Sequence, residues 1–274
     1  MSSGDVQNVE VERRGRLKRS QRMIAILTHL RARGSVSLSD LAAELEVSPA
    51  TMRRDIAELE EQGLLQRTHG GATAIESAVE LPVGLRNTRV PEAKTVIARG
   101  AAQLVPAGRH VVALNGGSTT LETARALSNR RDLTIVTNSL TAAGEVGRHP
   151  HLQVIMTGGV MRSHSFELVG ALAEQTFNSV NIGTAFLGVD GISATTGATT
   201  HDETEARTNR AMAARAQRTV VVADGSKIGA VTVASIMPAT EIDDLVTDSS
   251  ADPDHLATLR ELGIRVHVMP VAAR

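Results

Sequence analysis

Residues 47–55 of this 274-residue chain read Val-Ser-Pro-Ala-Thr-Met-Arg-Arg-Asp, and this stretch decides the fold of the amino-terminal part. Ser48 followed by Pro49 is a helix start, because a serine hydroxyl accepts hydrogen bonds from the first amides and proline suits the first helical position. Apolar residues then recur at helical spacing, which predicts a helix with one buried face that ends at a glycine. These residues are Met52, Ile56, Leu59 and Gly63.

Two further helices are predicted upstream by the same apolar spacing. Gly34 ends the first of them, and Ser37 stands at the N-cap position of the second. Only residues 46–48 separate the second helix from the third, and such a short connection is typical of a helix-turn-helix. The apolar positions are Met23, Ile24, Leu27 and Leu30 in the first helix, and Leu38, Leu41, Ala42 and Leu45 in the second.

The polar side of the third helix has the chemistry of DNA recognition. Thr51, Arg54 and Glu58 face outward when the apolar residues face the core, and Arg53 lies on the flank. Arginine reads guanine or clamps a phosphate, and threonine and helix amides bind backbone phosphates. The spacing alone leaves a plain three-helix bundle with a solvated arginine pair as an equal alternative.

Residues 64–72 read as two short strands around Gly70-Gly71 and predict a β wing. Such a wing would lay Arg67 and His69 along a DNA backbone. Eight basic residues and no acidic one lie between residues 13 and 33, and this local charge attracts a partner with phosphates. The whole chain, in contrast, has a formal charge of −1.

The composition excludes several classes of protein. The chain has no Cys, no Trp and no Tyr, and 3 Phe. It therefore has no disulfide scaffold, thiol nucleophile or Cys-ligated metal, and no aromatic platform for sugars or single-stranded bases. The histidines form no established ligand spacing, so we expect no metal and no cofactor. The amino terminus lacks a signal peptide and no apolar run spans a bilayer, so we expect a cytoplasmic protein of about two domains.

The stretch 47–55, taken with Leu59-Glu60, Gly63 and Arg67-Thr-His-Gly-Gly-Ala72, resembles the helix-turn-helix of the DeoR family of bacterial transcriptional regulators. The resemblance implies a winged helix-turn-helix that binds a double-stranded DNA operator. It implies that the recognition-helix contacts are Ser48, Thr51, Arg53 and Arg54. For Asp55 we favour orienting an arginine or accepting a helix hydrogen bond over contacting a base.

Strand and helix patterns alternate after a punctuated connector, which predicts an α/β domain with a mostly parallel sheet covered on both faces. The expected organisation is a DNA-binding domain at 16–72, a linker at 73–91 and the α/β domain at 92–274. Strands are expected at 111–114, 133–136, 154–156, 184–189, 219–223, 244–247 and 265–269. Helices are expected at 92–104, 119–127, 140–147, 168–177, 203–217 and 253–262.

Glycine-rich or polar loops follow five of the predicted strands, where ligands bind in parallel sheets. Glycine lets a backbone approach a ligand, hydroxyls and helix-start amides bind phosphate, and lysine neutralises it. Carboxylates such as Asp190 and Asp224 accept hydrogen bonds from sugar hydroxyls. None of the loops matches a P-loop or a Gly-x-Gly-x-x-Gly motif. The loops are residues 115–120, 137–139, 157–159, 190–191 and 224–227.

The order of these loops is similar to the effector domain of the DeoR family, whose fold is related to ribose-5-phosphate isomerase. The resemblance implies a Rossmann-like domain that senses a phosphorylated sugar, with the phosphate near Gly117, Ser118 and Thr119. Asn115 replaces the aspartate that the family usually has, which removes a negative charge from the expected site. The full expected effector site is Lys94, Asn115, Gly117, Ser118, Thr119, Asn138, Ser139, Gly158, Gly159, Asp190, Asp224 and Lys227.

The sequence therefore predicts a sugar-responsive regulator, most simply a repressor, that acts as a homodimer or homotetramer on symmetric half-sites. It predicts no membrane association and no catalysis. One alternative is a sugar-phosphate isomerase that uses Asp190 and Asp224 as catalytic carboxylates and carries the helices as an accessory. Another is a non-specific architectural DNA binder, which conflicts with the total charge and the second domain.

Overall fold

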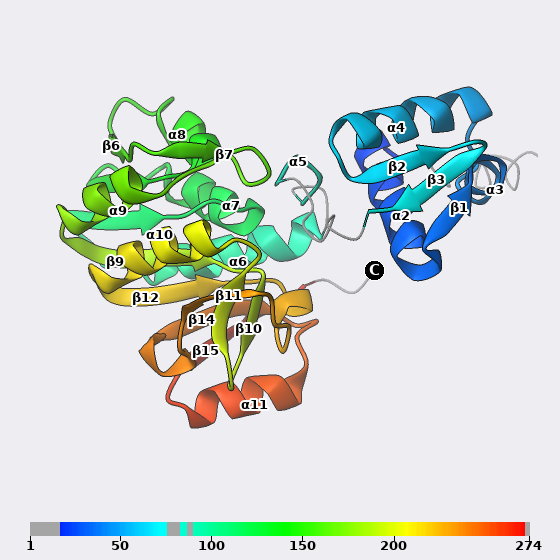
Figure 1. Ribbon diagram of the computed structural model, residues 1–274. Coiled ribbons are helices and arrows are strands. Elements are labelled where there is room, and N and C mark those ends of the chain that lie inside the picture. Colours follow the sequence, from blue (N-terminus) through cyan, green and yellow to red (C-terminus); the bar gives the residue numbers. More distant parts are fainter. Residues whose placement is uncertain (1–16, 76–82, 87–89, 272–274) are drawn as a thin grey trace, which may run out of the picture. The chain divides into compact units, whose positions relative to one another are not determined.

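The computed structural model describes residues 17–75, 83–86 and 90–271. Its contacts divide the chain into two compact units with a boundary between residues 81 and 82 (Figure 1). The basic positions 13, 14 and 16, and the expected domain start at 16, lie outside the described residues. Among the described helices, none is both long and apolar enough to cross a membrane.

The first unit is a winged helix-turn-helix with three helices and a three-stranded antiparallel sheet of order β1-β3-β2. Its elements are α2 (Arg19–Arg33), β1 (Ser35–Ser37), α3 (Leu38–Glu44), α4 (Pro49–Glu61), β2 (Leu65–Thr68) and β3 (Gly71–Ala74). The sequence did not predict β1, because three residues carry no periodicity and pair only with the distant β3. Gly71 permits that pairing, since a Cβ atom there would lie 2.1 Å from the carbonyl oxygen of Val36.

Local signals set the helix boundaries of this unit. The Ser48 hydroxyl accepts a hydrogen bond from the Thr51 amide at 3.1 Å, and Pro49 opens α4. Gly34 ends α2 with a positive φ of 73°, a conformation that favours glycine. The fully buried side chains come from every helix and from β2: Ile26, Leu30, Leu41, Met52, Ile56, Leu59 and Leu65.

The second unit is built on a seven-stranded sheet of order β15-β14-β12-β9-β4-β5-β6, in which all neighbouring strands are parallel. Each of the predicted strands is present; β15 has the predicted bounds and the other six have shifted ends. The strands are β4 (His110–Leu114), β5 (Leu133–Thr137), β6 (Gln153–Met156), β9 (Ile182–Gly188), β12 (Ala216–Val222), β14 (Asp244–Asp248) and β15 (Arg265–Met269).

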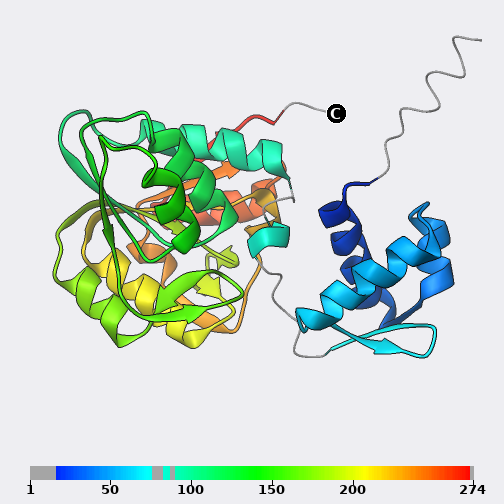
Figure 2. The same ribbon diagram turned by 90° about the horizontal axis from the view of Figure 1, so that it is seen from above.

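Helices cover both faces of this sheet, as Figure 2 shows. Along β9, Ala185 and Leu187 join the apolar cluster on one face, whereas Phe186 between them joins the other cluster. This alternation explains why the strands read as continuous apolar runs. The helices are α5 (Val83–Arg86), α6 (Pro91–Gln103), α7 (Ser118–Leu127), α8 (Leu140–Val146), α9 (Ala171–Asn178), α10 (Glu203–Ala214) and α11 (Pro253–Glu261), with short 3₁₀ turns η1 (Gly225–Lys227) and η2 (Ala239–Glu241).

Three sequence expectations need correction. The helix predicted at 168–177 begins as strand β8 (Glu167–Val169), and the one predicted at 203–217 stops at Ala214 because β12 begins two residues later. The connector expected at 73–91 includes the end of β3 and the short helix α5. Five strands described in this unit were missed, because they are short and pair outside the main sheet: β7 (Val160–Arg162) with β8, and β10 (Gly191–Ser193), β11 (Gly197–Thr200) and β13 (Ala234–Met237) in a second small sheet.

The strand order reverses between β4 and β9. From β4 the chain adds β5 and β6 on one side, whereas from β9 it adds β12, β14 and β15 on the other side. Connections therefore leave in opposite directions at the carboxyl ends of β4 and β9. A crevice at such a reversal is where parallel sheets bind ligands.

Candidate DNA-binding surface and effector pocket

The predicted recognition helix α4 exposes its two arginines. Arg53 and Arg54 are both exposed, and Thr51 is half-buried beside them. The Ser48 and Thr51 hydroxyls lie 2.9 Å apart at the amino end of the helix. The exposed face thus offers two guanidinium groups and the positive end of a helix, which is the donor set that duplex DNA accepts.

Asp55 lies on the opposite, buried face of α4. It is 2 % exposed and accepts two hydrogen bonds from the Arg22 guanidinium, at 2.8 and 3.2 Å. The Arg22 side chain is 12 % exposed, so this member of the predicted basic cluster ties α2 to α4 and is not presented to a partner. Asp55 therefore orients an arginine inside the domain and does not face the exposed surface.

The wing carries Arg67 and His69 as exposed residues. The Arg67 guanidinium lies 3.7 Å from the carboxylate of Glu60, and the Arg67 amide donates to the same carboxylate at 3.2 Å. Glu60 thus anchors the base of the wing to α4. His69 lies in the turn between β2 and β3, where nothing on the strand pair covers it.

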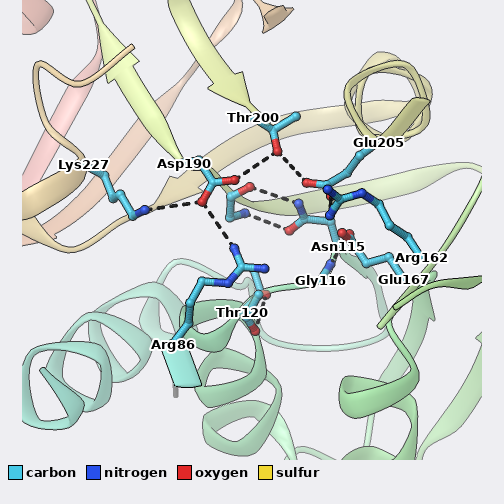
Figure 3. Close-up of polar contacts among 12 residues, drawn as sticks. Arg86, Asn115, Gly116, Thr120, Arg162, Glu167, Asp190, Thr200, Glu205 and Lys227 are labelled. Carbon is cyan, nitrogen blue, oxygen red and sulfur yellow. Dashed lines mark hydrogen bonds and ion pairs between the residues drawn. The ribbon is translucent and has the colours of Figure 1, made fainter. Parts of the chain in front are cut away.

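A polar pocket opens at the carboxyl ends of β4, β9 and β12, at the strand-order reversal (Figure 3). Six of the expected effector residues line it: Gly117, Ser118, Thr119, Asp190, Asp224 and Lys227. Arg86, Gly116, Glu167 and Glu205 complete its polar lining. The fold thus brings together residues from three of the five predicted loops, more than a hundred positions apart in the chain.

The wall made by residues 116–119 is suited to an anion. Gly117 is the N-cap of α7 and has a φ of 132°, a conformation that side chains rarely adopt. The first amides of the helix after it have no acceptor within the helix, and they carry the positive end of its dipole. Gly116 has to be glycine, since a Cβ atom would lie 2.2 Å from Cγ of Glu167.

Asp190 is the centre of charge in the pocket. One carboxylate oxygen accepts from Arg86 Nη1 at 3.2 Å and from Lys227 Nζ at 3.3 Å, and the other accepts from the Thr200 hydroxyl at 3.1 Å. Burial raises the pKa of Asp190, but the charges of Arg86, Lys227 and His201 outweigh burial and hold this pKa below its usual value. Asp190 is therefore ionised and already paired.

Glu167 and Glu205 form a carboxyl pair in the same pocket. Glu167 Oε1 accepts from the Gly116 amide at 2.6 Å, while Glu205 Oε1 lies 2.6 Å from the Thr200 hydroxyl oxygen and Glu205 pairs with Arg162 at 3.1 Å. Burial raises the pKa of Glu167, and burial together with the neighbouring Glu167 charge raises the pKa of Glu205 well above its usual range. The pair thus holds a proton that an exposed carboxyl would release.

Asn115, expected in the effector site, is not among the residues that line the pocket. It is 1 % exposed, and its side-chain amide is bonded to both backbone groups of Gly188. It therefore joins β4 to β9 beneath the pocket floor. Lys94 also lies behind the pocket, 3 % exposed, where its ammonium group donates to the carbonyl oxygen of Arg86.

The other expected residues outside the pocket support neighbouring loops. Asn138 donates to the carbonyl oxygen of Leu168 at 3.1 Å, and Ser139 caps α8 by accepting from Ala142 at 3.2 Å. Gly158 and Gly159 pack against the segment 168–172, since Cβ atoms there would contact Leu172 and Val169. These four residues were expected at the ligand because they follow strands that end at the same edge of the sheet as the pocket. The packing shows that this edge is longer than the pocket.

Three pocket residues were missed by sequence reasoning: Arg86, Glu167 and Glu205. Arg86 lies in the expected linker. Glu167 lies next to one predicted helix and Glu205 lies within another, and a single glutamate at such a position is usually interpreted as a solvent-exposed side chain. Of the three, only Arg86 had a sequence signal, because the family that the sequence resembles often has an arginine in this connector.

A DNA-binding winged helix-turn-helix linked to a ligand pocket in a parallel α/β sheet defines a ligand-sensing transcriptional regulator. The model of the DeoR-like helix-turn-helix domain matches residues 22–78, and that of the DeoR C terminal sensor domain matches residues 89–249. The chain belongs to the DeoR family of transcriptional regulators.

Similar proteins include named repressors. A putative aga operon transcriptional repressor of Escherichia coli O157:H7 is 36 % identical over 250 residues, which cover 90 % of this chain and 93 % of that protein. A glycerol-3-phosphate regulon repressor of Escherichia coli strain K12 is 32 % identical over 233 residues, 85 % of this chain and 92 % of that protein. Among solved structures, ribose 5-phosphate isomerase A of Methanocaldococcus jannaschii matches with a TM-score of 0.37 and 20 % identity, over 51 % of this chain and 53 % of that one.

Proposed function

We propose that this protein represses genes of carbohydrate metabolism by binding an operator through α4 and the wing, and that a phosphorylated sugar or polyol in the pocket releases the DNA. The single observation that carries the effector is that one pocket combines groups that bind phosphate with groups that bind hydroxyls. Arg86, Lys227 and the amino end of α7 line it together with the carboxyl groups of Asp190, Glu167 and Glu205.

This combination fits a ligand that carries both a phosphate group and hydroxyl groups. A phosphate monoester carries about −1.5 to −2 charges at neutral pH, and helix amides with a lysine and an arginine neutralise it. Carboxylates accept hydrogen bonds from hydroxyl groups, and the protonated carboxyl of the Glu167–Glu205 pair is also a donor. The name of one similar repressor, that of a glycerol-3-phosphate regulon, mentions a phosphorylated polyol and supports the same class of compound.

DNA recognition rests on Ser48, Thr51, Arg53 and Arg54, with Arg67 and His69 on the backbone. One DNA-binding domain of this size contacts few base pairs, so we propose a homodimer or a pair of dimers that places two such domains on symmetric half-sites. The DNA partner puts the protein in the cytoplasm. We propose no catalytic role, because Asp190 is held by two cations and a hydroxyl and is a poor proton acceptor.

The test has two steps. First, the protein selects an operator from random duplex DNA, and its affinity is measured by fluorescence anisotropy of labelled DNA. Second, sn-glycerol 3-phosphate, D-ribose 5-phosphate, D-glucose 6-phosphate and their unphosphorylated parents are added to the complex. We expect at least one phosphate ester to release the operator and to raise the melting temperature of the free protein, while its parent does neither.

Replacing Ser118 with leucine fills the amino end of α7 and should give a protein that binds operator but ignores the ester. Ser179→Leu is the matched control, because Ser179 is exposed at the end of α9 and lies outside the pocket lining. A wild-type protein that selects no sequence, or an operator complex indifferent to every ester, would contradict the proposed function.

A further inference from the structure

A second hollow lies at the opposite edge of the seven-stranded sheet from the effector pocket. Its volume is about 660 Å³, which falls within the range of about 300–1,000 Å³ that small-molecule sites usually have. The lining comes from the amino ends of β4, β5, β6, β9 and β12 and from the residues just before them, whereas the effector pocket opens at the carboxyl ends. The two sites therefore share no lining residue.

Two arginines line this hollow from neighbouring segments. Arg109 directly precedes β4, Arg131 lies two residues before β5, and the two strands are adjacent in the sheet. Both residues are exposed, and within the described part of the chain neither pairs with a carboxylate. The nearby Asp132 does not neutralise them, because its carboxylate is held by the Arg130 guanidinium at 2.9 and 3.0 Å. The hollow thus has two positive charges to offer to a ligand.

The amide side chains of the hollow present donors as well. Asn181 Oδ1 accepts from Nη2 of Arg215 at 2.7 Å, and Gln153 Oε1 accepts from the Thr134 hydroxyl at 3.1 Å. A guanidinium can only donate, so its contact fixes which amide atom of Asn181 is the oxygen. Since the oxygen of each amide already has a donor, the NH₂ group of each remains for a ligand. Guanidinium and amide donors together suit a ligand rich in acceptor atoms.

His110 adds a fixed, uncharged ring to the lining. Its Nε2 atom lies 2.9 Å from the hydroxyl oxygen of buried Thr184. Gly183 leaves room for the ring, since a Cβ atom there would lie 2.3 Å from Cε1 of His110. Burial and the positive charge of Arg130 lower the pKa of His110, so the imidazole is neutral at neutral pH. The ring is thus a hydrogen-bonding group that adds no charge.

Apolar side chains form the floor of the hollow. Leu133 and Ile182 line it and are themselves buried, and Val111 lines it beside them. A ligand made only of charged groups leaves this floor unused, and an uncharged ligand leaves the arginines unused. A nucleoside phosphate uses both, because its base has apolar faces with hydrogen-bonding edges and its phosphates accept paired hydrogen bonds from arginine.

We propose that this hollow is a second ligand site, for a nucleoside di- or triphosphate whose phosphates bind Arg109 and Arg131 and whose base lies on the apolar floor. The site goes beyond the proposed function, because it is separate from the effector pocket and needs neither an operator nor a sugar ester.

The experiment titrates the full chain with ATP by isothermal titration calorimetry. Adenosine and inorganic pyrophosphate serve as probes for the two parts of the ligand. Arg109→Gln and Arg131→Gln each remove one guanidinium group. Gln153→Glu keeps an oxygen for the Thr134 hydroxyl but replaces the NH₂ donor with a carboxylate oxygen. Each variant is first shown to be folded by circular dichroism.

Two further variants control for the place of binding. Arg99→Gln removes an exposed arginine of α6 that lines neither site, so it tests whether any lost positive charge weakens binding. Ser118→Leu fills the amino end of α7 in the effector pocket, so it tests whether ATP is bound there instead.

ATP should bind wild-type protein, and adenosine and pyrophosphate should each bind more weakly, because each reaches only one of the two surfaces. Arg109→Gln, Arg131→Gln and Gln153→Glu should each weaken ATP binding about tenfold or more, the effect expected when one hydrogen bond to a charged group is lost. Arg99→Gln and Ser118→Leu should bind ATP as wild type does.

Absence of ATP binding to wild-type protein would overturn the inference. Wild-type affinity in both Arg109→Gln and Arg131→Gln would do the same, as would loss of ATP binding in Ser118→Leu. Pyrophosphate that binds as tightly as ATP would show an anion site that does not hold a base. All these results leave the proposed function intact, since operator release by a sugar ester does not enter the measurement. An operator complex indifferent to every ester would, in turn, leave the nucleotide site standing.

Discussion

The side-chain amide of Asn115 and the backbone of Gly188 form two reciprocal hydrogen bonds: Asn115 Nδ2 donates to the Gly188 carbonyl oxygen at 3.0 Å, and the Gly188 amide donates to Asn115 Oδ1 at 2.8 Å. The two residues end adjacent parallel strands at the point where the strand order reverses. The asparagine side chain suits this position because its amide supplies both a hydrogen-bond donor and an acceptor for the Gly188 backbone.

Asn115→Asp should therefore destabilise the second unit. The carboxylate keeps the bond from the Gly188 amide but faces the Gly188 carbonyl oxygen without a donor, at a cost of about 1–3 kcal/mol. Urea unfolding followed by circular dichroism measures the loss, and Asn178→Asp at the exposed end of α9 is the control. The loss should shrink at acid pH, where a protonated aspartate donates again. Equal unfolding midpoints for the variant and wild type would contradict this role.

Asp55→Asn should destabilise the DNA-binding unit and leave the second unit unchanged. Removing one partner leaves the Arg22 guanidinium without its carboxylate in a mostly buried place, which costs about 3 kcal/mol or more. Hydrogen exchange resolves the two units, and amides of α2 and α4 should exchange faster in the variant. Asp40→Asn, at an exposed position of α3, is the control. Faster exchange in both units alike would show that Asp55 has no local role.

Arg54→Ala should weaken operator binding by about 1–3 kcal/mol if the guanidinium reads a base, and should relax the preference at one operator position. Arg54 is exposed, so the melting temperature should not change. Anisotropy with the selected operator and its single-base variants provides the measurement. Arg148→Ala, an exposed arginine of the second unit, is the control. If Arg54→Ala binds every operator variant as wild type does, α4 does not read DNA through this residue.

The Glu167–Glu205 pair should make stability fall as pH rises. Both pKa values are raised in the folded protein, so the native state keeps protons that the unfolded chain releases above about pH 4.3. Stability from this source is complete below that pH and is lost as the pH rises through the folded-state pKa. Glu205→Gln does not ionise, so its melting temperature should fall less between about pH 5 and pH 8.

Glu203→Gln is the control for the carboxyl pair, because Glu203 is exposed on the same helix. Its melting temperature should follow the wild-type pH profile. Parallel profiles for wild type and Glu205→Gln would show that the pair does not retain a proton.

Lys94→Met should weaken effector binding although Lys94 does not line the pocket. The substitution removes the hydrogen bond that holds the Arg86 carbonyl oxygen, and a loss of about 1 kcal/mol corresponds to a severalfold higher half-saturating concentration. The rise in melting temperature at graded ester concentrations measures this shift. Arg99→Met, on the exposed side of α6, should bind as wild type does. Unchanged ester affinity in Lys94→Met would remove the positioning role.

Much of the first unit was predictable because its signals are local. Ser48 and Pro49 mark the start of α4, and each helix repeats apolar residues within a few positions of one another. The edge of the second sheet that carries the polar pocket was also predictable, since polar loops follow successive parallel strands. The short strands β1, β7 and β8 were not, because strands of three residues carry no periodicity, and β1 moreover pairs with the distant β3.

The sequence by itself determined the winged helix-turn-helix, the parallel α/β sheet and the glycine-rich wall at residues 116–119, because each depends on residues close together in the chain. Tertiary structure alone decided which polar residues meet. It placed Arg86 against Asp190, 104 positions away, and turned Asn115 toward Gly188, 73 positions away. The strand order determines which loops lie next to one another. It depends on how helices cover the two apolar faces of the sheet, and no local sequence pattern contains that information.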